Sequence, residues 1–202
     1  VNLFESFNRA FPSGKIIHFS TTISCKRNSS SYSQIKYGLK EWIRKNHHIT
    51  LTCGVFVDYP SFGQFKLLNF LSISPVVIIP FKETLVQLSS RDTVVKTISK
   101  ITDTPFLRTR DVSCLSRPIS LEELQKKIAR LRGNSNILVL NLPYFISLSV
   151  FFITNFFLKN LRLMEKLHGI KYNKVKNKNL LEDVEIRVSI EKNLEKFKYR
   201  LY

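Results

Sequence analysis

Apolar and polar positions alternate with helical and strand-like periods along the first two thirds of the chain. Phenylalanines in residues 1–11 lie at helical spacing, and Pro12 ends that predicted helix. A strand is predicted to begin at Ile16, and the polar run 26–33 predicts a loop before the next helix. The amino-terminal region therefore predicts a helix, a strand and a loop in that order.

The clearest amphipathic helix is predicted over 33–45. Its apolar residues fall at i, i+4, i+7 and i+8, and its cations are predicted to face solvent on the opposite side. The apolar positions are Ile35, Leu39, Trp42 and Ile43, and the cations are Lys36, Lys40, Arg44 and Lys45. Alternation of apolar and polar residues over 49–55 then predicts a strand with one buried face.

Further elements follow in alternation. A short helix is predicted over 62–71, the β-branched run 76–79 predicts a buried central strand, and 93–101 predicts an amphipathic helix. This order predicts the α/β class, as a single small globular domain with a mixed sheet, flanking helices and a C-terminal helical extension.

A helix start is marked at Ser120, because Glu123 follows at the spacing of a capping box. Gly133 is the natural stop of that helix. Residues 181–201 fit either a helix or a strand, since apolar residues there satisfy both periods. We predict an α/β domain over 1–135, an apolar helical segment over 136–170 and a charged extension over 171–202.

The run 137–158 is apolar and long enough to cross a bilayer core. Polar residues interrupt it, including Asn141, Pro143 and Asn155, and basic residues flank both of its ends. We therefore favour a buried strand, a turn and an apolar helix over a membrane span.

The net charge of the chain is +17, with 32 Lys and Arg against 15 Asp and Glu. Such a basic domain favours phosphate-rich partners, with an anionic membrane surface as the competing partner. The predicted RNA-binding residues are the clustered cations Lys26, Arg27, Lys36, Lys40, Arg44, Lys45, Arg108 and Arg110.

Motifs for catalysis are not found in the sequence. It contains no Gly-x-Ser-x-Gly elbow, no phosphate-binding Walker loop and no Gly-x-Gly-x-x-Gly fingerprint. His47 and His48 have no carboxylate or cysteine at ligand spacing, so a turn at a helix end is favoured over a metal site. The cysteines, Cys25, Cys53 and Cys114, suggest neither a disulfide framework nor a zinc site. We therefore expect a protein that is not an enzyme and has no cofactor or metal.

The order of segments from 15 to 144 resembles the large ribosomal subunit protein ten family, the stalk-base proteins, and especially its mitochondrial members. The run Leu-Lys-Glu-Trp-Ile-Arg-Lys-Asn at 39–46 is similar to the family's Leu-Arg-Lys-x-Leu-Arg-x helix. The run Ser-Pro-Val-Val-Ile-Ile at 74–79 is similar to its Gly-Pro strand. The family's Tyr-Arg-Gly turn falls near Arg27, where glycine is absent, so its RNA contacts do not transfer.

The resemblance implies a structural constituent of the mitochondrial ribosome's large subunit, in the mitochondrial matrix. Its partners would be ribosomal RNA, neighbouring large-subunit proteins and dimers of the acidic stalk protein. The stalk dimers would dock on an apolar helix at Phe152, Phe156, Leu163 and Leu167. The alternative is a single-span accessory subunit of an organelle inner-membrane complex, anchored by 137–158. A first residue other than Met, Val1, would suit a removed import sequence.

Overall fold

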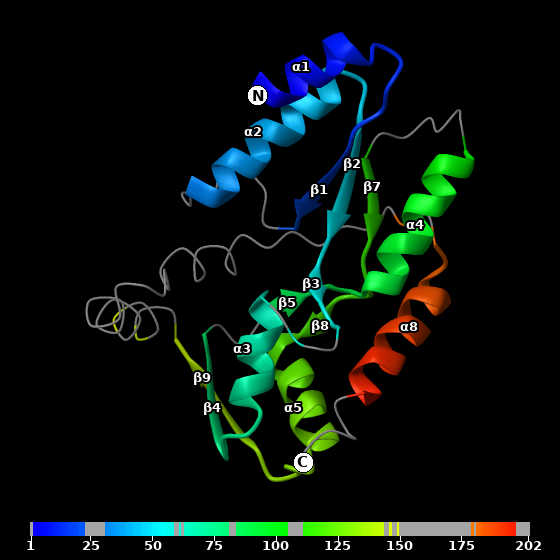
Figure 1. Ribbon diagram of the computed structural model, residues 1–202. Coiled ribbons are helices and arrows are strands. Elements are labelled where there is room, and N and C mark those ends of the chain that lie inside the picture. Colours follow the sequence, from blue (N-terminus) through cyan, green and yellow to red (C-terminus); the bar gives the residue numbers. More distant parts are fainter. Residues whose placement is uncertain are drawn as a thin grey trace.

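Three parallel strands form the central sheet of the computed structural model. The structure describes residues 2–22, 31–58, 61, 63–80, 84–104, 111–143, 146, 149, 179 and 181–196. The strand order is β1 (Ile17–Thr21), β2 (Ile49–Cys53) and β7 (Asp111–Cys114). Helices flank this sheet (Figure 1), which confirms the predicted α/β class.

The two faces of the central sheet are covered by different helices. Helix α2 (Ser31–Lys45) lies on one side, and α4 (Arg91–Asp103) lies on the other (Figure 1). Helix α1 (Asn2–Ala10) packs on α2, where the rings of Phe4 and Trp42 are 5.5 Å apart between centroids. The apolar core on the α4 side includes Leu51, Val94 and Val112.

The second part of the fold consists of short strand pairs and three helices. The parallel pairs are β3 (Val55–Phe56) with β6 (Leu88–Ser89) and β4 (Val76–Pro80) with β9 (Leu138–Leu142), and β5 (Leu85–Val86) pairs antiparallel with β8 (Ile119–Ser120). The helices are α3 (Gly63–Leu71), α5 (Leu121–Leu131) and α8 (Asp183–Glu195). A second apolar core joins these elements around Phe65, Leu124 and Ile186.

The predicted helix start at Ser120 and the helix stop at Gly133 are confirmed, although only one of the two hydrogen bonds of a capping box is present at Ser120. The Ser120 Oγ accepts a hydrogen bond from the Glu123 backbone N–H at 3.0 Å, at the start of α5. Gly133 follows that helix with φ of 80°, a conformation that side chains disfavour. At the end of α2, His47 has φ of 62°, so the predicted histidine turn is also confirmed.

The prediction of a buried central strand at 76–79 is wrong. Strand β4 pairs with β9 alone among the described residues, and Val76 and Ile78 are 42% and 51% exposed. Val77 and Ile79, on the other face, are buried. A β-branched run favours a strand, but it does not reveal whether one face or two are covered.

Two further predictions of burial differ from the structure. Strand β2 is buried on both faces, because α2 covers the polar face that was expected in solvent. The ambiguous run 181–201 includes helix α8, which buries Ile186 and Ile190 and exposes Val188. Side-chain packing therefore selects the helical period there.

The apolar run 137–158 is described only in part. Its beginning forms β9, and most of the rest, with Phe152 and Phe156, lies outside the described residues. None of the helices in the described part of the chain has the length and hydropathy needed to cross a membrane.

Gly54 allows two backbone segments to approach closely. A Cβ atom at this position would lie 2.0 Å from the Gln87 carbonyl oxygen, well inside contact distance. The adjacent Val55 N–H donates to that same oxygen at 2.9 Å. The junction of β2 with β3 therefore requires a residue without a side chain.

We expect Gly54→Ala to lower the free energy of unfolding by about 2 kcal/mol or more, because the backbone must move to admit the methyl group. Gly38→Ala is the matched control, since no atom lies within 4 Å of its Cβ position in α2. That change should stabilise the protein by about 0.5–1 kcal/mol. Urea unfolding measures both variants, and equal effects would contradict the close approach at Gly54.

Candidate active site

One face of the central sheet is polar and almost entirely buried. In register across the three strands, its positions are His18, Thr50 and Asp111 in one row and Ser20, Thr52 and Ser113 in the next. All of these except Asp111 are buried. Because side chains alternate along a strand, the other positions of the same strands are mostly apolar and face α4.

Helix α2 covers this polar face with lysines. The Lys40 ammonium lies 3.0 Å from a carboxylate oxygen of Asp111, and the Lys40 side chain is only 15% exposed. The Lys36 ammonium donates to the Phe19 backbone carbonyl at 3.1 Å. These contacts pin α2 to the outer strands β1 and β7.

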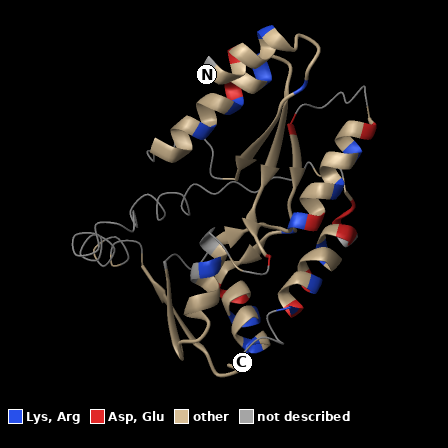
Figure 2. Ribbon diagram, in the orientation of Figure 1, with Lys and Arg blue, Asp and Glu red and all other residues tan. Residues whose placement is uncertain are grey.

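The prediction that Lys40 faces solvent is therefore wrong, Lys36 is half-buried, and Ile35, expected to face inward, is 69% exposed. Predicting the buried side of a helix from its apolar positions is valid when the helix packs on an apolar sheet face, whereas the sheet face under α2 is polar. Arg44 and Lys45 are exposed as predicted, with Arg44 bonded to Glu41 at 2.7 Å. Basic and acidic residues are interspersed along the helices (Figure 2).

The remaining predicted site residues lie outside the described part of the chain. They are Lys26, Arg27, Arg108 and Arg110 of the predicted RNA-binding set, and Phe152, Phe156, Leu163 and Leu167 of the predicted stalk-protein contact.

Tyr32 and Lys36 lie one helical turn apart at the beginning of α2. The Lys36 Nζ is 5.9 Å from the centroid of the Tyr32 ring. Its bond to the Phe19 carbonyl places the pair beside β1, whose carboxyl end is followed by the buried Thr22. Partial burial raises the pKa of the Tyr32 phenol, although the residue is still 45% exposed.

This pair was not identified from the sequence. Lys36 was counted only as a cation of an amphipathic helix, and Tyr32 was placed in the preceding loop. Two features of the sequence could have indicated the pair. Tyr32 and Lys36 are four residues apart, and the hydroxyl residues Ser20, Thr21 and Thr22 end the preceding strand.

His18 is a buried imidazole on the polar face. It is 6% exposed, and its Nε2 has no hydrogen-bond partner. Burial, and then the charges of Lys36 and Lys40, lower the pKa of His18 to about 4. The imidazole is therefore neutral at physiological pH and adds no charge to the two lysines.

His48 has a structural role instead. Its Nδ1 accepts a hydrogen bond from the Ile16 backbone N–H at 3.4 Å, and its Nε2 lies 2.8 Å from the Asn8 side-chain oxygen. It thus ties α1 to the turn after α2. Among the residues that the structure describes, no three His, Cys, Asp or Glu side chains are grouped as a metal site would need.

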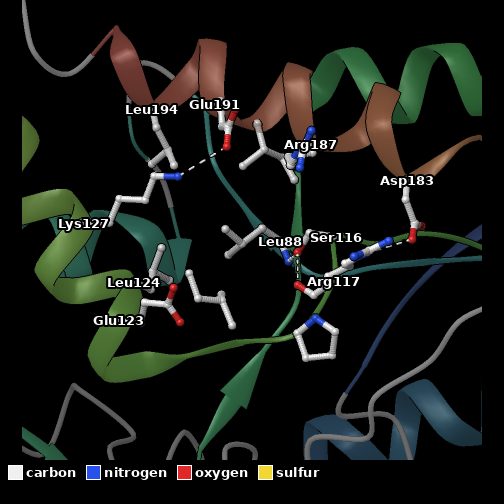
Figure 3. A pocket seen from close by; sticks show the side chains of 13 residues that line it. Leu88, Ser116, Arg117, Glu123, Leu124, Lys127, Asp183, Arg187, Glu191 and Leu194 are labelled. Carbon is white, nitrogen blue, oxygen red and sulfur yellow. Dashed lines mark hydrogen bonds and ion pairs between the residues drawn. The ribbon is translucent and has the colours of Figure 1, made fainter.

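A separate pocket of about 270 Å³ lies between α5 and α8 (Figure 3). Its wall includes the apolar side chains of Leu88, Leu124 and Leu194. Two ion pairs join its sides, Lys127 with Glu191 at 3.7 Å and Arg117 with Asp183 at 3.2 Å. The lining contains no tyrosine, histidine or cysteine, and none of it comes from β1 or α2.

The Tyr32 and Lys36 pair is the stronger candidate for chemistry because of its place in the fold. Open α/β sheets bind ligands at the carboxyl ends of their parallel strands. β1, β2 and β7 are parallel, so their carboxyl ends meet at one edge, and Thr22 lies at that edge. Lys36 contacts β1 at Phe19, two residues before the strand's last residue, Thr21. A phenol and an ammonium beside a strand that ends at this edge can exchange a proton with a substrate oxygen.

The fold is similar to that of two solved enzyme structures. The chain matches L-threonine dehydrogenase from Phytophthora infestans with a TM-score of 0.63 and 10% identity, over 97% of this chain and 69% of that one. It matches a nucleoside-diphosphate-sugar epimerase from Staphylococcus aureus with a TM-score of 0.64 and 12% identity, over 96% and 69%. Neither a protein-family model nor a curated protein sequence matches the chain. The fold is therefore the Rossmann-like α/β fold of these two enzymes.

This likeness overturns the ribosomal prediction. The resemblance to the stalk-base family is wrong, and with it the structural ribosomal role and the assignment as a protein that is not an enzyme. The predicted partners, ribosomal RNA, large-subunit proteins and acidic stalk dimers, are withdrawn, as is the single-span membrane subunit. The domain limits and the mitochondrial location stay predictions.

The burial of His18 predicts a pH-dependent stability. Its folded pKa of about 4 lies below the unfolded value of 6.5, so as pH falls the unfolded chain binds a proton that the folded protein excludes. Stability is full above pH 6.5 and falls by about 1.4 kcal/mol per pH unit toward pH 4. Urea unfolding between pH 7.5 and pH 4 measures this loss, and His18→Gln should have a shallower slope.

His48→Gln is the control for this measurement, because burial also lowers the pKa of His48. Removal of either imidazole should reduce the slope of the unfolding free energy against pH by the contribution of that one histidine. Parallel curves for the wild type and His18→Gln would show that His18 is not the buried neutral group described above.

Proposed function

We propose that the protein is an NAD(P)-dependent oxidoreductase or epimerase in which Tyr32 and Lys36 handle the proton at a substrate oxygen. The substrate class is a small molecule with a secondary hydroxyl or a carbonyl group. The main support for this proposal is the position of the Lys36 ammonium, which lies 3.1 Å from the Phe19 carbonyl oxygen and 5.9 Å from the centroid of the Tyr32 ring. The dehydrogenase and the epimerase of the same fold support the reaction class.

Tyr32 is the general acid in the reductive direction. The phenol is protonated at neutral pH and can donate to a carbonyl oxygen as that oxygen gains negative charge. The phenolate left behind lies near the Lys36 ammonium, and opposite charges at this range attract by about 1–4 kcal/mol in a partly solvated site. In the oxidative direction the same phenolate accepts the proton of a hydroxyl.

Thr22 is the second group at this edge. Its hydroxyl follows the last residue of β1, and its side chain is buried. A hydroxyl there can donate a hydrogen bond to the reacting oxygen and orient it toward Tyr32. The site therefore combines one proton donor, one fixed cation and one orienting hydroxyl.

The described residues fit the reacting end of a dinucleotide better than its diphosphate. A diphosphate is usually held by a glycine turn between a strand and the start of a helix. Gly54 follows β2, but it leads into β3 rather than into a helix. Gly54 therefore does not form a diphosphate-binding turn of this kind.

Substitution of the pair tests this function. We expect Tyr32→Phe to lower kcat by about 10²-fold or more in NAD(P)H-linked assays, because the phenol proton is lost. Lys36→Met should lower it similarly. The assay panel contains threonine, simple ketones and secondary alcohols, and nucleotide-linked sugars, each with both nicotinamide dinucleotides.

Lys45→Met is the matched control, since Lys45 is an exposed cation at the other end of the same helix. It should leave kcat unchanged. Full activity in Tyr32→Phe, with the fold intact by circular dichroism, would contradict the proposed role. Equal losses in Lys45→Met would indicate a general effect of charge instead.

A further inference from the structure

Two cysteines face each other across the carboxyl ends of β2 and β7. Cys53 and Cys114 are directly opposed in the parallel register, and their sulfur atoms are 3.5 Å apart. Both are buried, with 3% and 0% of their surfaces exposed. They lie on the sheet face that packs against α4, opposite the polar face.

The backbone around the sulfurs is fixed by hydrogen bonds. The Gly54 N–H donates to the Ser89 Oγ at 2.9 Å, and the Ser89 hydroxyl donates to the Cys114 carbonyl at 2.5 Å. Ser89 thus links the end of β2 to the end of β7. The pairing of β2 with β7 and the two hydrogen bonds of Ser89 therefore fix the backbone that carries both cysteines.

The two thiols differ in acidity. The hydrogen bond between them raises the pKa of Cys53 and lowers the pKa of Cys114. Cys114 is therefore the thiol that ionises first, and thiolates are the form that oxidants attack. A second thiol in contact with the attacked sulfur is the arrangement that completes a disulfide.

We propose that Cys53 and Cys114 are a redox-responsive pair that hydrogen peroxide converts into a disulfide joining β2 to β7. In the first step the Cys114 sulfur attacks a peroxide oxygen, the O–O bond breaks, and a sulfenic acid and water form. In the second step the Cys53 sulfur attacks the Cys114 sulfur, the S–O bond breaks, and a second water leaves with the Cys53 proton. Each sulfur loses one electron, and the peroxide gains two.

The geometry allows this bond with small movements. Neighbouring strands are about 4.8 Å apart, and disulfides join Cα atoms about 4.4–6.8 Å apart. The sulfurs must move from 3.5 Å to about 2.05 Å, a closure of about 1.5 Å. Rotation about the Cα–Cβ bonds supplies part of this closure.

The disulfide would restrict the edge of the sheet that carries the candidate active site. Thr21 lies opposite Cys53 in register, directly before Thr22. The cross-link would also join two positions 61 apart in the sequence, which restricts the unfolded chain. The inference rests on the cysteines alone and does not depend on the proposed function.

Mass spectrometry of the oxidised protein tests the pair. Cys25→Ser is the starting variant, so that Cys53 and Cys114 are the remaining thiols. The folded protein is treated with hydrogen peroxide, quenched with catalase, unfolded and alkylated. We expect an intact mass two hydrogen atoms lower than that of the reduced protein, with no alkyl group added. Digestion should give a peptide pair cross-linked between Cys53 and Cys114, and dithiothreitol should restore both free thiols.

The control variants are Cys25→Ser with Cys53→Ser and Cys25→Ser with Cys114→Ser. Neither can form the internal cross-link, and both should alkylate or oxidise at the single thiol. The oxidised parent should keep its near-ultraviolet circular dichroism and melt at a higher temperature than the reduced parent. Complete alkylation of both thiols after peroxide, or a cross-link that forms only in urea, would overturn the proposal.

Discussion

The arrangement depends on the polar face of the three-stranded sheet. Five side chains on that face are buried, and polar groups without partners cost about 1–3 kcal/mol each when they are removed from water. The helix that covers them must therefore bring polar groups of its own. Lys40 contacts Asp111 and Lys36 contacts the Phe19 carbonyl, so α2 adds charged contacts to its buried Ile43, while α4 packs through apolar contact. This difference between the faces fixes the rotation of α2 about its axis.

That rotation brings the candidate active site together. With Lys36 turned toward β1, Tyr32 lies one turn earlier on the same helix, with its ring centroid 5.9 Å from the Lys36 Nζ. The neutral His18 beneath the lysines avoids a third positive charge, which is why its low pKa matters to this face. The net charge of +17 suggested a nucleic-acid partner, but part of this charge belongs to side chains such as Lys40 that pack against the sheet.

Much of the fold could be predicted from local pattern, and the site could not. The helices at 2–10, 31–45 and 121–131 follow from spacing and from caps such as Ser120, because those signals lie within a few residues. Which face of α2 is buried depends on residues about twenty to eighty positions away, at His18 and Asp111, and sequence period does not report it. The ribosomal resemblance failed for a related reason, since alternating helices and strands occur in many α/β folds.

The most direct test of this account is the reactivity of individual lysines in the folded protein. Reductive methylation followed by peptide mass spectrometry compares Lys36 and Lys40 with the exposed Lys45 and Lys96. If α2 turns its lysines toward the sheet, Lys36 and Lys40 react more slowly than Lys45 and Lys96, and unfolding in urea removes the difference. Equal rates for all four lysines in the folded protein would contradict the buried polar face and the site built on it.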